Sequence, residues 1–352
     1  MRVATLTELT SGVDALYLSG RTSVPSELLE RLELARKIAS DGVVGPPFQF
    51  GDCEFTMSGH GWGMYRYLLE HPYGRIGVTS STRFPSIRFQ PYAPFLHGVG
   101  PRGVVDWIEG LITQTCGHVR FSVARIDLFA DFQGWTLEGD SRHEFMCRAK
   151  QRRTFEEDGI FTGVDFGSRN TGTKFARIYD KSIQMREVGA GYWPMIWGDK
   201  YDPSQPVIRI EFEVKGDWLR EFGLRSPEEV LDATGALWLH LTSDWLTHRI
   251  PGLDQTKARW SISPEWECVQ RASITEGAQG INRMFLGLSR GGIANLLPGL
   301  TGYLSSFAAY ANARTFRELL PDLDTFMGIY EKDSGQTFEE RVEDKRRKFG
   351  LP

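Results

Sequence analysis

The chain has 352 residues, with a hydrophobic fraction of 41%, a charged fraction of 24% and a formal net charge of −4. These values are typical of a globular protein with a core of its own, and the net charge argues against a protein that coats nucleic acid by charge alone. The four cysteines form no CxxC pair, so we expect neither a structural zinc site nor a disulfide framework. No run of about 18 apolar residues occurs, and we expect a cytoplasmic protein without membrane contact.

Hydrophobic periodicity and turn residues divide the chain into helices and strands. The predicted elements are an extended lead-in over 1–24, a helix over 25–40, strands within 47–90, a helix over 102–115, a strand over 120–132, a basic helix over about 140–153, a hairpin over 160–181, a loop over 187–205, a strand over 207–215 and a helix over 226–248. An irregular connection over 250–275 follows, and then helices at about 279–294, 300–319 and 336–348.

This order of elements predicts an α+β protein. A central antiparallel or mixed sheet with packed helices would be followed by a mainly helical C-terminal part. We expect an N-terminal extension and helix over 1–44, a central domain over 45–250 and a helical C-terminal region over 251–352.

The predicted hairpin ends in a cationic strand, Arg177-Ile178-Tyr179-Asp180-Lys181. Alternate residues of a strand share a face, so Arg177, Tyr179 and Lys181 are expected to point the same way. Two cations beside a phenol suit an anionic, phosphate-bearing ligand. They could also lower the pKa of the phenol and so activate it as a nucleophile.

Two further strands carry acidic faces, with Asp127 and Asp131 on one and Glu211 and Glu213 on the other. If these strands are neighbours, their carboxylates repel one another unless a cation or a shared proton lies between them. Oxygen ligands favour Mg²⁺ or Mn²⁺, and such a metal beside Tyr179 could polarise a phosphodiester. The alternative is a solvated ladder of cross-strand ion pairs, in which the tyrosine serves only packing.

Three blocks of the chain together resemble the replication initiation factor family. They are Arg125-Ile126-Asp127-Leu128-Phe129-Ala130-Asp131, then Gly167-Ser168-Arg169 followed by Arg177-Ile178-Tyr179-Asp180-Lys181, and finally Arg209-Ile210-Glu211-Phe212-Glu213-Val214-Lys215. That family contains initiators of rolling-circle replication from plasmids and filamentous phages, and relaxases of integrative conjugative elements. The resemblance covers about residues 45–250.

The resemblance implies a DNA nickase and strand transferase that cuts one strand at a replication origin and rejoins it through a phosphotyrosine link. The implied site residues are the nucleophile Tyr179 with its partner Lys181, the Mg²⁺ or Mn²⁺ ligands Asp127, Glu211, Asp131 and Glu213, and the DNA-phosphate-binding residues Ser168, Arg169, Arg177 and Lys215. The implied partners are origin DNA with its single-stranded nick site, a host helicase and a second copy of the chain.

Two other functions stay open at this stage. One is a conjugative relaxase, and the other is a DNA-binding regulator that has kept the fold without nicking. Other tyrosines remain possible nucleophiles, namely Tyr65, Tyr67, Tyr73, Tyr92, Tyr192 and Tyr201.

Overall fold

The computed structural model describes residues 6–42, 45–137, 143–189, 191–276, 278 and 293–349. The chain forms two compact units, residues 1–284 and residues 285–352, and each is described by itself. Within the described ranges, no helix is both long and apolar enough to cross a membrane.

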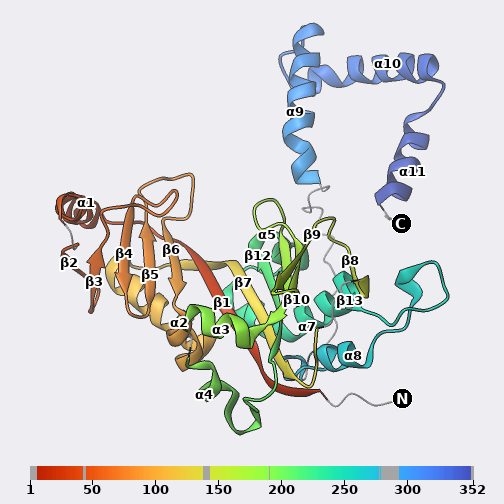
Figure 1. The fold of residues 1–352 in the computed structure, drawn as a ribbon. Coiled ribbons are helices and arrows are strands. Elements are labelled where there is room, and N and C mark those ends of the chain that lie inside the picture. Colours follow the sequence, from red (N-terminus) through yellow and green to blue (C-terminus); the bar gives the residue numbers. More distant parts are fainter. Residues whose placement is uncertain are drawn as a thin grey trace. The chain divides into compact units, whose positions relative to one another are not determined.

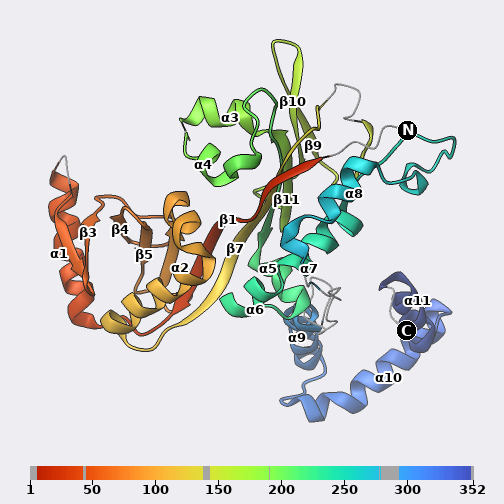
Figure 2. The same cartoon turned by 90° about the horizontal axis from the view of Figure 1, so that it is seen from below.

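The larger unit is built around an 11-stranded sheet with the strand order β2-β3-β4-β5-β6-β1-β7-β12-β11-β10-β9 (Figures 1 and 2). Every neighbouring pair of these strands is antiparallel. The strands are β1 (Thr7–Arg21), β2 (Pro47–Phe50), β3 (Cys53–Met57), β4 (Tyr67–His71), β5 (Gly74–Val78), β6 (Ile87–Pro91), β7 (Arg120–Gln133), β9 (Arg152–Glu157), β10 (Ile160–Gly167), β11 (Lys174–Asp180) and β12 (Ile208–Lys215). The α+β prediction is confirmed.

Strand β1 lies in the middle of the sheet, where the sequence predicts only an extended lead-in. It pairs with β6 on one side and with β7 along its whole length. In Figure 2, β1 and β7 run from the half that holds β3, β4 and β5 to the half that holds β10 and β11. Three register shifts between β1 and β7 interrupt the alternation of apolar and polar residues, which explains why the sequence shows no clear strand here.

The helices of this unit are α1 (Ser26–Asp41), α2 (Ala93–Cys116), α3 (Lys181–Val188), α4 (Trp193–Trp197), α5 (Gly216–Leu219), α6 (Pro227–Asp232), α7 (Thr234–His240) and α8 (Pro264–Gln270). Helices α1, α2 and α7 pack on the apolar face of the sheet, while α4 packs on the other face, where Trp193 and Trp197 form a second cluster with Phe129. Leu32 of α1, Ile108 of α2 and Trp238 of α7 share one core with Leu128 and Phe212 of the sheet. The helices predicted over 25–40 and 102–115 are therefore confirmed.

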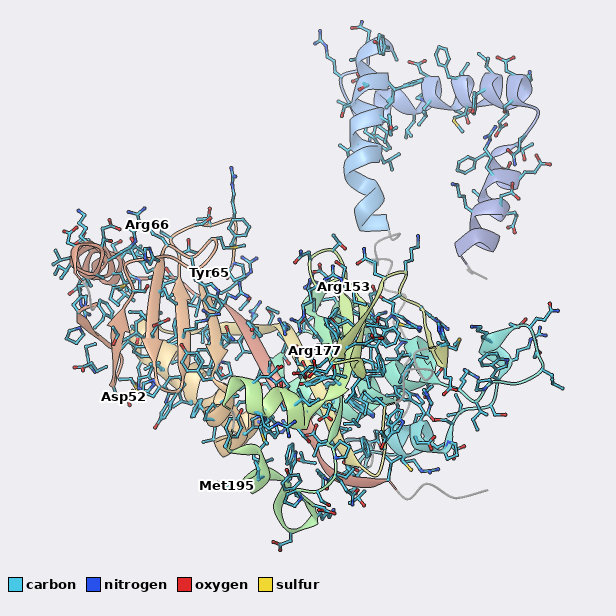
Figure 3. All side chains as sticks on the ribbon, viewed as in Figure 1. Asp52, Tyr65, Arg66, Arg153, Arg177 and Met195 are labelled. Atoms are coloured by element: carbon cyan, nitrogen blue, oxygen red, sulfur yellow. The ribbon has the colours of Figure 1, made fainter. Side chains whose placement is uncertain are left out.

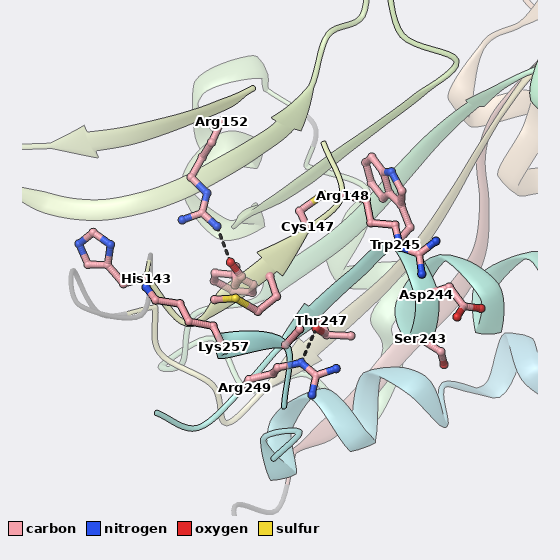
Figure 4. Close-up of a pocket in the computed structure, with 13 residues that line it drawn as sticks. His143, Cys147, Arg148, Arg152, Ser243, Asp244, Trp245, Thr247, Arg249 and Lys257 are labelled. Carbon is pink, nitrogen blue, oxygen red and sulfur yellow. Dashed lines mark hydrogen bonds between the residues drawn. The ribbon is translucent and has the colours of Figure 1, made fainter. Parts of the chain in front are cut away.

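The basic helix predicted over about 140–153 is wrong for the part that the structure describes, and residues 140–142 lie outside it. Here the chain forms β8 (Phe145–Cys147) and the edge strand β9 instead. Strand β8 pairs with β13 (Leu246–His248), which also ends the helix predicted over 226–248. A cavity of about 640 Å³ lies beside these two strands, with Arg148 and Arg152 in its wall (Figure 4). Pairing with a distant strand thus decides the local structure.

The smaller unit contains α9 (Ile293–Tyr310), α10 (Phe316–Ser334) and α11 (Phe338–Phe349). The helix predicted at about 336–348 is confirmed, whereas the one predicted at about 300–319 is divided between α9 and α10, and the rest of α10 is not predicted. Thr315 caps α10 by accepting a hydrogen bond from the backbone N–H of Glu318, and Gly335 ends the helix in a left-handed conformation. Of the helix predicted at about 279–294, residues 279–292 lie outside the described ranges.

Candidate active site

Tyr179 lies on the polar face of the sheet and donates a hydrogen bond to a carboxylate of the neighbouring strand. Its hydroxyl is 3.1 Å from Oε2 of Glu211, and Arg177 forms an ion pair with the other oxygen of the same carboxylate. The register explains the contact, because Arg177 lies directly opposite Glu211 across the β11–β12 ladder. The sequence prediction that the cationic strand and the acidic strands share one face is thus met for these three residues.

The pKa of Tyr179 is shifted in the direction opposite to the one predicted from the sequence. Burial raises the pKa well above its usual value, and the negative charge of Glu211 raises it further, although Arg209 and Arg177 act against both effects. The phenol is therefore protonated in this arrangement. It requires a base at the moment of attack, and the carboxylate of Glu211 is the acceptor within hydrogen-bond reach.

Two more carboxylates lie beside Glu211 and are buried with it. Glu213 stands directly opposite Asp127 across the β12–β7 ladder, and both contact the guanidinium of Arg125, at 2.9 Å and 2.5 Å. Burial raises the pKa of Asp127 to about 7, and Glu211 and Glu213 add to the shift while Arg125 opposes it. The three carboxylates thus form an electrostatically coupled group.

These acids do not fit a metal site as they are placed. Arg125 binds Asp127 and Glu213, Arg169 lies 3.3 Å from Glu213, and Arg177 binds Glu211. Guanidinium groups thus contact both oxygens of Asp127, Oε1 of Glu211 and Oε2 of Glu213, which would have to bind Mg²⁺ or Mn²⁺ instead. Across the part of the chain that the structure describes, no group of three or more His, Cys, Asp or Glu side chains is arranged to hold a metal ion. Metal dependence stays a prediction, and we route no chemical step through a metal.

Asp131, predicted as a further metal ligand, takes part in a buried ion-pair network instead. Both of its oxygens accept hydrogen bonds from Arg209 at 2.7 Å, and Oδ2 also accepts one from the indole of Trp197 at 2.8 Å. Asp14 of β1 binds a third nitrogen of Arg209 at 2.9 Å. The guanidinium also stacks on Trp193, 3.9 Å from the ring centroid. We therefore leave Asp131 out of the proposed catalytic group.

The partners of this network come from segments in which the sequence shows no functional signal. Asp14 lies in the bulged strand β1, and Trp193 and Trp197 lie in α4, inside the segment predicted as a loop over 187–205. The spacing of the two tryptophans, one helical turn apart, is the only sequence feature that indicates a buried face here.

Lys181 begins helix α3 and does not continue the strand, so its predicted place on β11 is wrong. Asp180 caps the helix by accepting hydrogen bonds from the backbone N–H groups of Ser182 and Ile183 at 2.8 and 3.2 Å. The ammonium group is nevertheless near the nucleophile, 5.8 Å from the ring centroid of Tyr179 and 4.8 Å from that of Trp193. Burial and the charge of Arg209 lower the pKa of Lys181 to about 8, although nearby acids raise it.

The loop between β10 and β11 carries Ser168 and Arg169, and the remaining predicted phosphate-binding residue, Lys215, ends β12. Gly167 has a φ of +92°, which favours glycine, and starts the turn. The carbonyl of Ser168 accepts from the N–H of Gly172 at 2.8 Å, and Ser168 lines a different cavity from that of Tyr179. Lys215 donates to the backbone carbonyl of Arg169. Only Arg169 of this group therefore faces Tyr179, while Ser168 and Lys215 shape the loop.

Tyr179 lines a cavity of about 490 Å³, within the usual range for a ligand site. Arg169 and Arg177 line it, together with Asp165 and Gly163 of β10. Gly163 is paired with Tyr179, and a Cβ at this position would come within 2.9 Å of the tyrosine's own Cβ. The cavity therefore brings the candidate nucleophile together with two cations, and Glu211 adjoins it through its contacts with Tyr179 and Arg177.

No family model and no curated protein matches the chain. A solved structure described as a rolling circle replication initiator protein from Geobacillus stearothermophilus is similar to it, with a TM-score of 0.46 and 17% sequence identity. The match covers 76% of this chain and 98% of the other. The side chains around Tyr179 carry the proposal that follows.

Proposed function

We propose that the protein initiates rolling-circle DNA replication by nicking one strand at an origin and later rejoining it. The observation that carries the proposal is the hydrogen bond from Tyr179 to Glu211 at the edge of a cavity lined by Arg169 and Arg177. This arrangement supplies a nucleophile, its base and two phosphate-binding cations on one face of one sheet.

The reaction uses side chains of this protein and one proton from solvent. The phenol oxygen of Tyr179 attacks phosphorus while its proton passes to Glu211, and the bond from phosphorus to the 3′-oxygen of the DNA breaks. The 3′-oxygen takes a proton from solvent and becomes the hydroxyl that primes synthesis, and the 5′-phosphate stays on the tyrosine. Arg169 and Arg177 bind the phosphate oxygens, and the ammonium group of Lys181 offsets the charge that develops at the phenol oxygen. Reversal of these steps rejoins the strand without ATP.

Two alternatives make different predictions. A DNA-binding regulator without nicking activity would have no need for a tyrosine hydrogen-bonded to a carboxylate beside a cavity, so the Tyr179–Glu211 contact favours the enzyme. A conjugative relaxase would use the same chemistry and would differ in its preferred DNA, an origin of transfer.

The proposal is tested by incubating the protein with supercoiled DNA that carries its origin, with and without Mg²⁺ or Mn²⁺. We expect a covalent protein–DNA adduct that Tyr179→Phe abolishes. Tyr192→Phe is the matched control, because Tyr192 is a half-buried tyrosine that neighbours Trp193, 5.5 Å between ring centroids. An adduct that persists in Tyr179→Phe would remove Tyr179 as the nucleophile, and tight binding without any nick in the native protein would favour the regulator.

The dependence of adduct formation on the divalent ion, together with Mn²⁺ binding, tests the predicted need for a metal. Glu213→Gln should lower the affinity for Mn²⁺ if the acids coordinate a metal after the arginines move away. An adduct yield that is equal with the divalent ion and with a chelator would support a reaction carried by the arginines and Glu211 alone.

A further inference from the structure

Two arginines stack on one tryptophan in the half of the sheet that lies away from Tyr179. The guanidinium carbons of Arg75, from β5, and of Arg88, from β6, are each 4.2 Å from the centroid of the same ring of Trp62. Arg88 also lies 5.6 Å from the ring centroid of Tyr17 in β1. Two cations and two aromatic rings therefore gather on neighbouring strands.

Neither arginine has an acidic partner among the described residues. Arg75 donates only to the side-chain oxygen of Gln90, at 2.9 and 2.7 Å. Glu70 lies opposite Arg75 across the β4–β5 ladder, but the two form no ion pair. Nε of Arg88 is buried without a hydrogen-bond partner. Buried polar groups without partners are costly, so this cluster lacks an anion that would complete it.

The electrostatics of Arg88 agree with this conclusion. Burial lowers its pKa, and the positive charges of Arg75 and Arg125 lower it further, while Tyr65 and Tyr17 act in the other direction. Like charges that are held together without a counter-ion raise the affinity of a site for an anion.

A hydrogen-bonded turn holds Trp62 in place. Trp62 and Tyr65 exchange backbone hydrogen bonds of 2.8 and 3.1 Å, and Gly63 between them has a φ of +61°. The turn packs closely on β5, because a Cβ at Gly77 would lie 2.8 Å from the ring of Tyr65 and 3.2 Å from that of Trp62. The conformation of this turn thus fixes the ring against which both arginines stack.

The cluster lies on the same face of the sheet as the Tyr179 cavity. Arg88 is directly opposite Ser19 in β1, and Tyr17, two residues along, is directly opposite Arg125 in β7. The guanidinium carbon of Arg125 lies 5.0 Å from the ring centroid of Tyr17, and Arg125 also forms an ion pair with Glu213, one of the carboxylates beside Glu211. In Figure 3, Tyr65 lies on the β2–β6 half and Arg177 lies nearer the middle of the unit. A row of arginines therefore runs across the sheet from the cluster to the nucleophile.

We propose that Arg75, Trp62 and Arg88 form a binding subsite for a backbone phosphate of the single DNA strand whose scissile phosphate lies at Tyr179. The subsite rests on the proposed function and extends it, because it assigns a path to the strand. The two positions are four strand spacings apart, about 19 Å, and the register places them at Thr10 and Ser19 of β1, about 30 Å apart along that strand, so the two phosphates are about 35 Å apart. Trp62 and Tyr17 give the bases aromatic surfaces beside the arginines.

The test measures the binding of fluorescein-labelled single-stranded DNA by anisotropy over a series of salt concentrations. A short oligonucleotide covers only the Tyr179 cavity, and a longer one extends beyond the nick position by more than about 35 Å on each side. For the double variant Arg75→Gln/Arg88→Gln, we expect about tenfold or greater loss of affinity for the long oligonucleotide. Its salt slope should fall by about 0.7 for each phosphate that the variant no longer neutralises, while the short oligonucleotide binds as before.

The matched control is Arg66→Gln. Arg66 is an exposed arginine in the same half of the sheet, also beside an aromatic ring, but it is paired with Glu33 at 2.9 Å. It should leave the salt slope of the long oligonucleotide unchanged. Arg75→Gln alone removes a half-buried side chain whose partner is an amide, so it reports on the subsite even if the double variant unfolds.

Equal salt slopes for Arg75→Gln, the double variant and the native protein would overturn the subsite. An equal loss with the short and the long oligonucleotide would do the same, because the effect would then act on the Tyr179 cavity or on the fold. Failure of the proposed function is read separately, since it appears as absence of the covalent adduct in the native protein whatever the salt slope.

Discussion

The buried pair of Asp131 and Arg209 gives the sharpest test of whether this acid is structural or metal-binding. Both side chains are 0% exposed, and Asp131 accepts three hydrogen bonds, two from Arg209 and one from Trp197. Asp131→Asn removes the charge and turns an amide N–H toward the guanidinium. Breaking a buried ion pair by changing one partner costs about 3 kcal/mol, although Asp14 remains beside Arg209 and softens the loss.

For a unit of this size, about 3 kcal/mol corresponds to a fall in Tm of about 5 °C. Thermal unfolding followed by circular dichroism, with urea unfolding as a second measure, gives the value. The control is Asp232→Asn, since Asp232 and its partner Arg102 are both exposed and their ion pair should contribute little. A native Tm for Asp131→Asn together with weaker Mn²⁺ binding would refute the reasoning and return Asp131 to the metal site.

Three further predictions follow from single side chains. The rate of adduct formation should fall as the pH rises through about 8, because Lys181 loses its charge there. Lys181→Arg should keep the rate at pH values near 9. A rate that rises through pH 8 would instead make Lys181 a base. Burial lowers the pKa of His248 to about 4, so its contribution to stability is present above the unfolded-state pKa of about 6.5 and is lost as the pH falls through 4. The free energy of unfolding lost in acid is at most about 3 kcal/mol, because the carboxylate of Glu144, 3.2 Å from the ring, favours the charged ring. The free energy of unfolding of His248→Gln should fall less in acid than that of the native protein. Gly163→Ala should reduce adduct formation while DNA binding is kept, because its Cβ would displace Tyr179; an unchanged adduct yield would show that the tyrosine tolerates the shift.

The sequence predicts the three charged strands well because each depends only on the two-residue period of a strand. Arg177 and Glu211 then come together because β11 and β12 are neighbours in the sheet, which is the condition that the predicted shared face depends on. The same reasoning fails for Lys181, because Asp180 caps a helix and ends the strand one residue earlier. A capping residue at the end of a strand is a local signal that could have been used.

Other features could not be predicted because their causes lie far away in the sequence. The pKa of Tyr179 depends on burial and on Glu211, 32 residues further along, and Asp131 is bound by Trp197, 66 residues away. The bulges of β1 obscure its strand pattern in the sequence, although Leu16 and Leu18, on either side of Tyr17, are fully buried. Local patterns predict which residues share a face, whereas burial and the choice of partner depend on the assembled sheet.

The arrangement around Tyr179 also explains how an incoming phosphate could start the reaction. In this structure Arg177 binds Glu211, which is the same carboxylate that accepts the hydrogen bond of Tyr179. A phosphate in the cavity competes with Glu211 for the guanidinium, since arginine binds both groups through the same paired N–H donors. As the phosphate takes Arg177, the carboxylate loses its counter-charge and becomes a stronger base toward the phenol. Under the proposed function, Tyr179 would thus stay protonated until a phosphate is bound, which would limit attack to DNA that occupies the cavity.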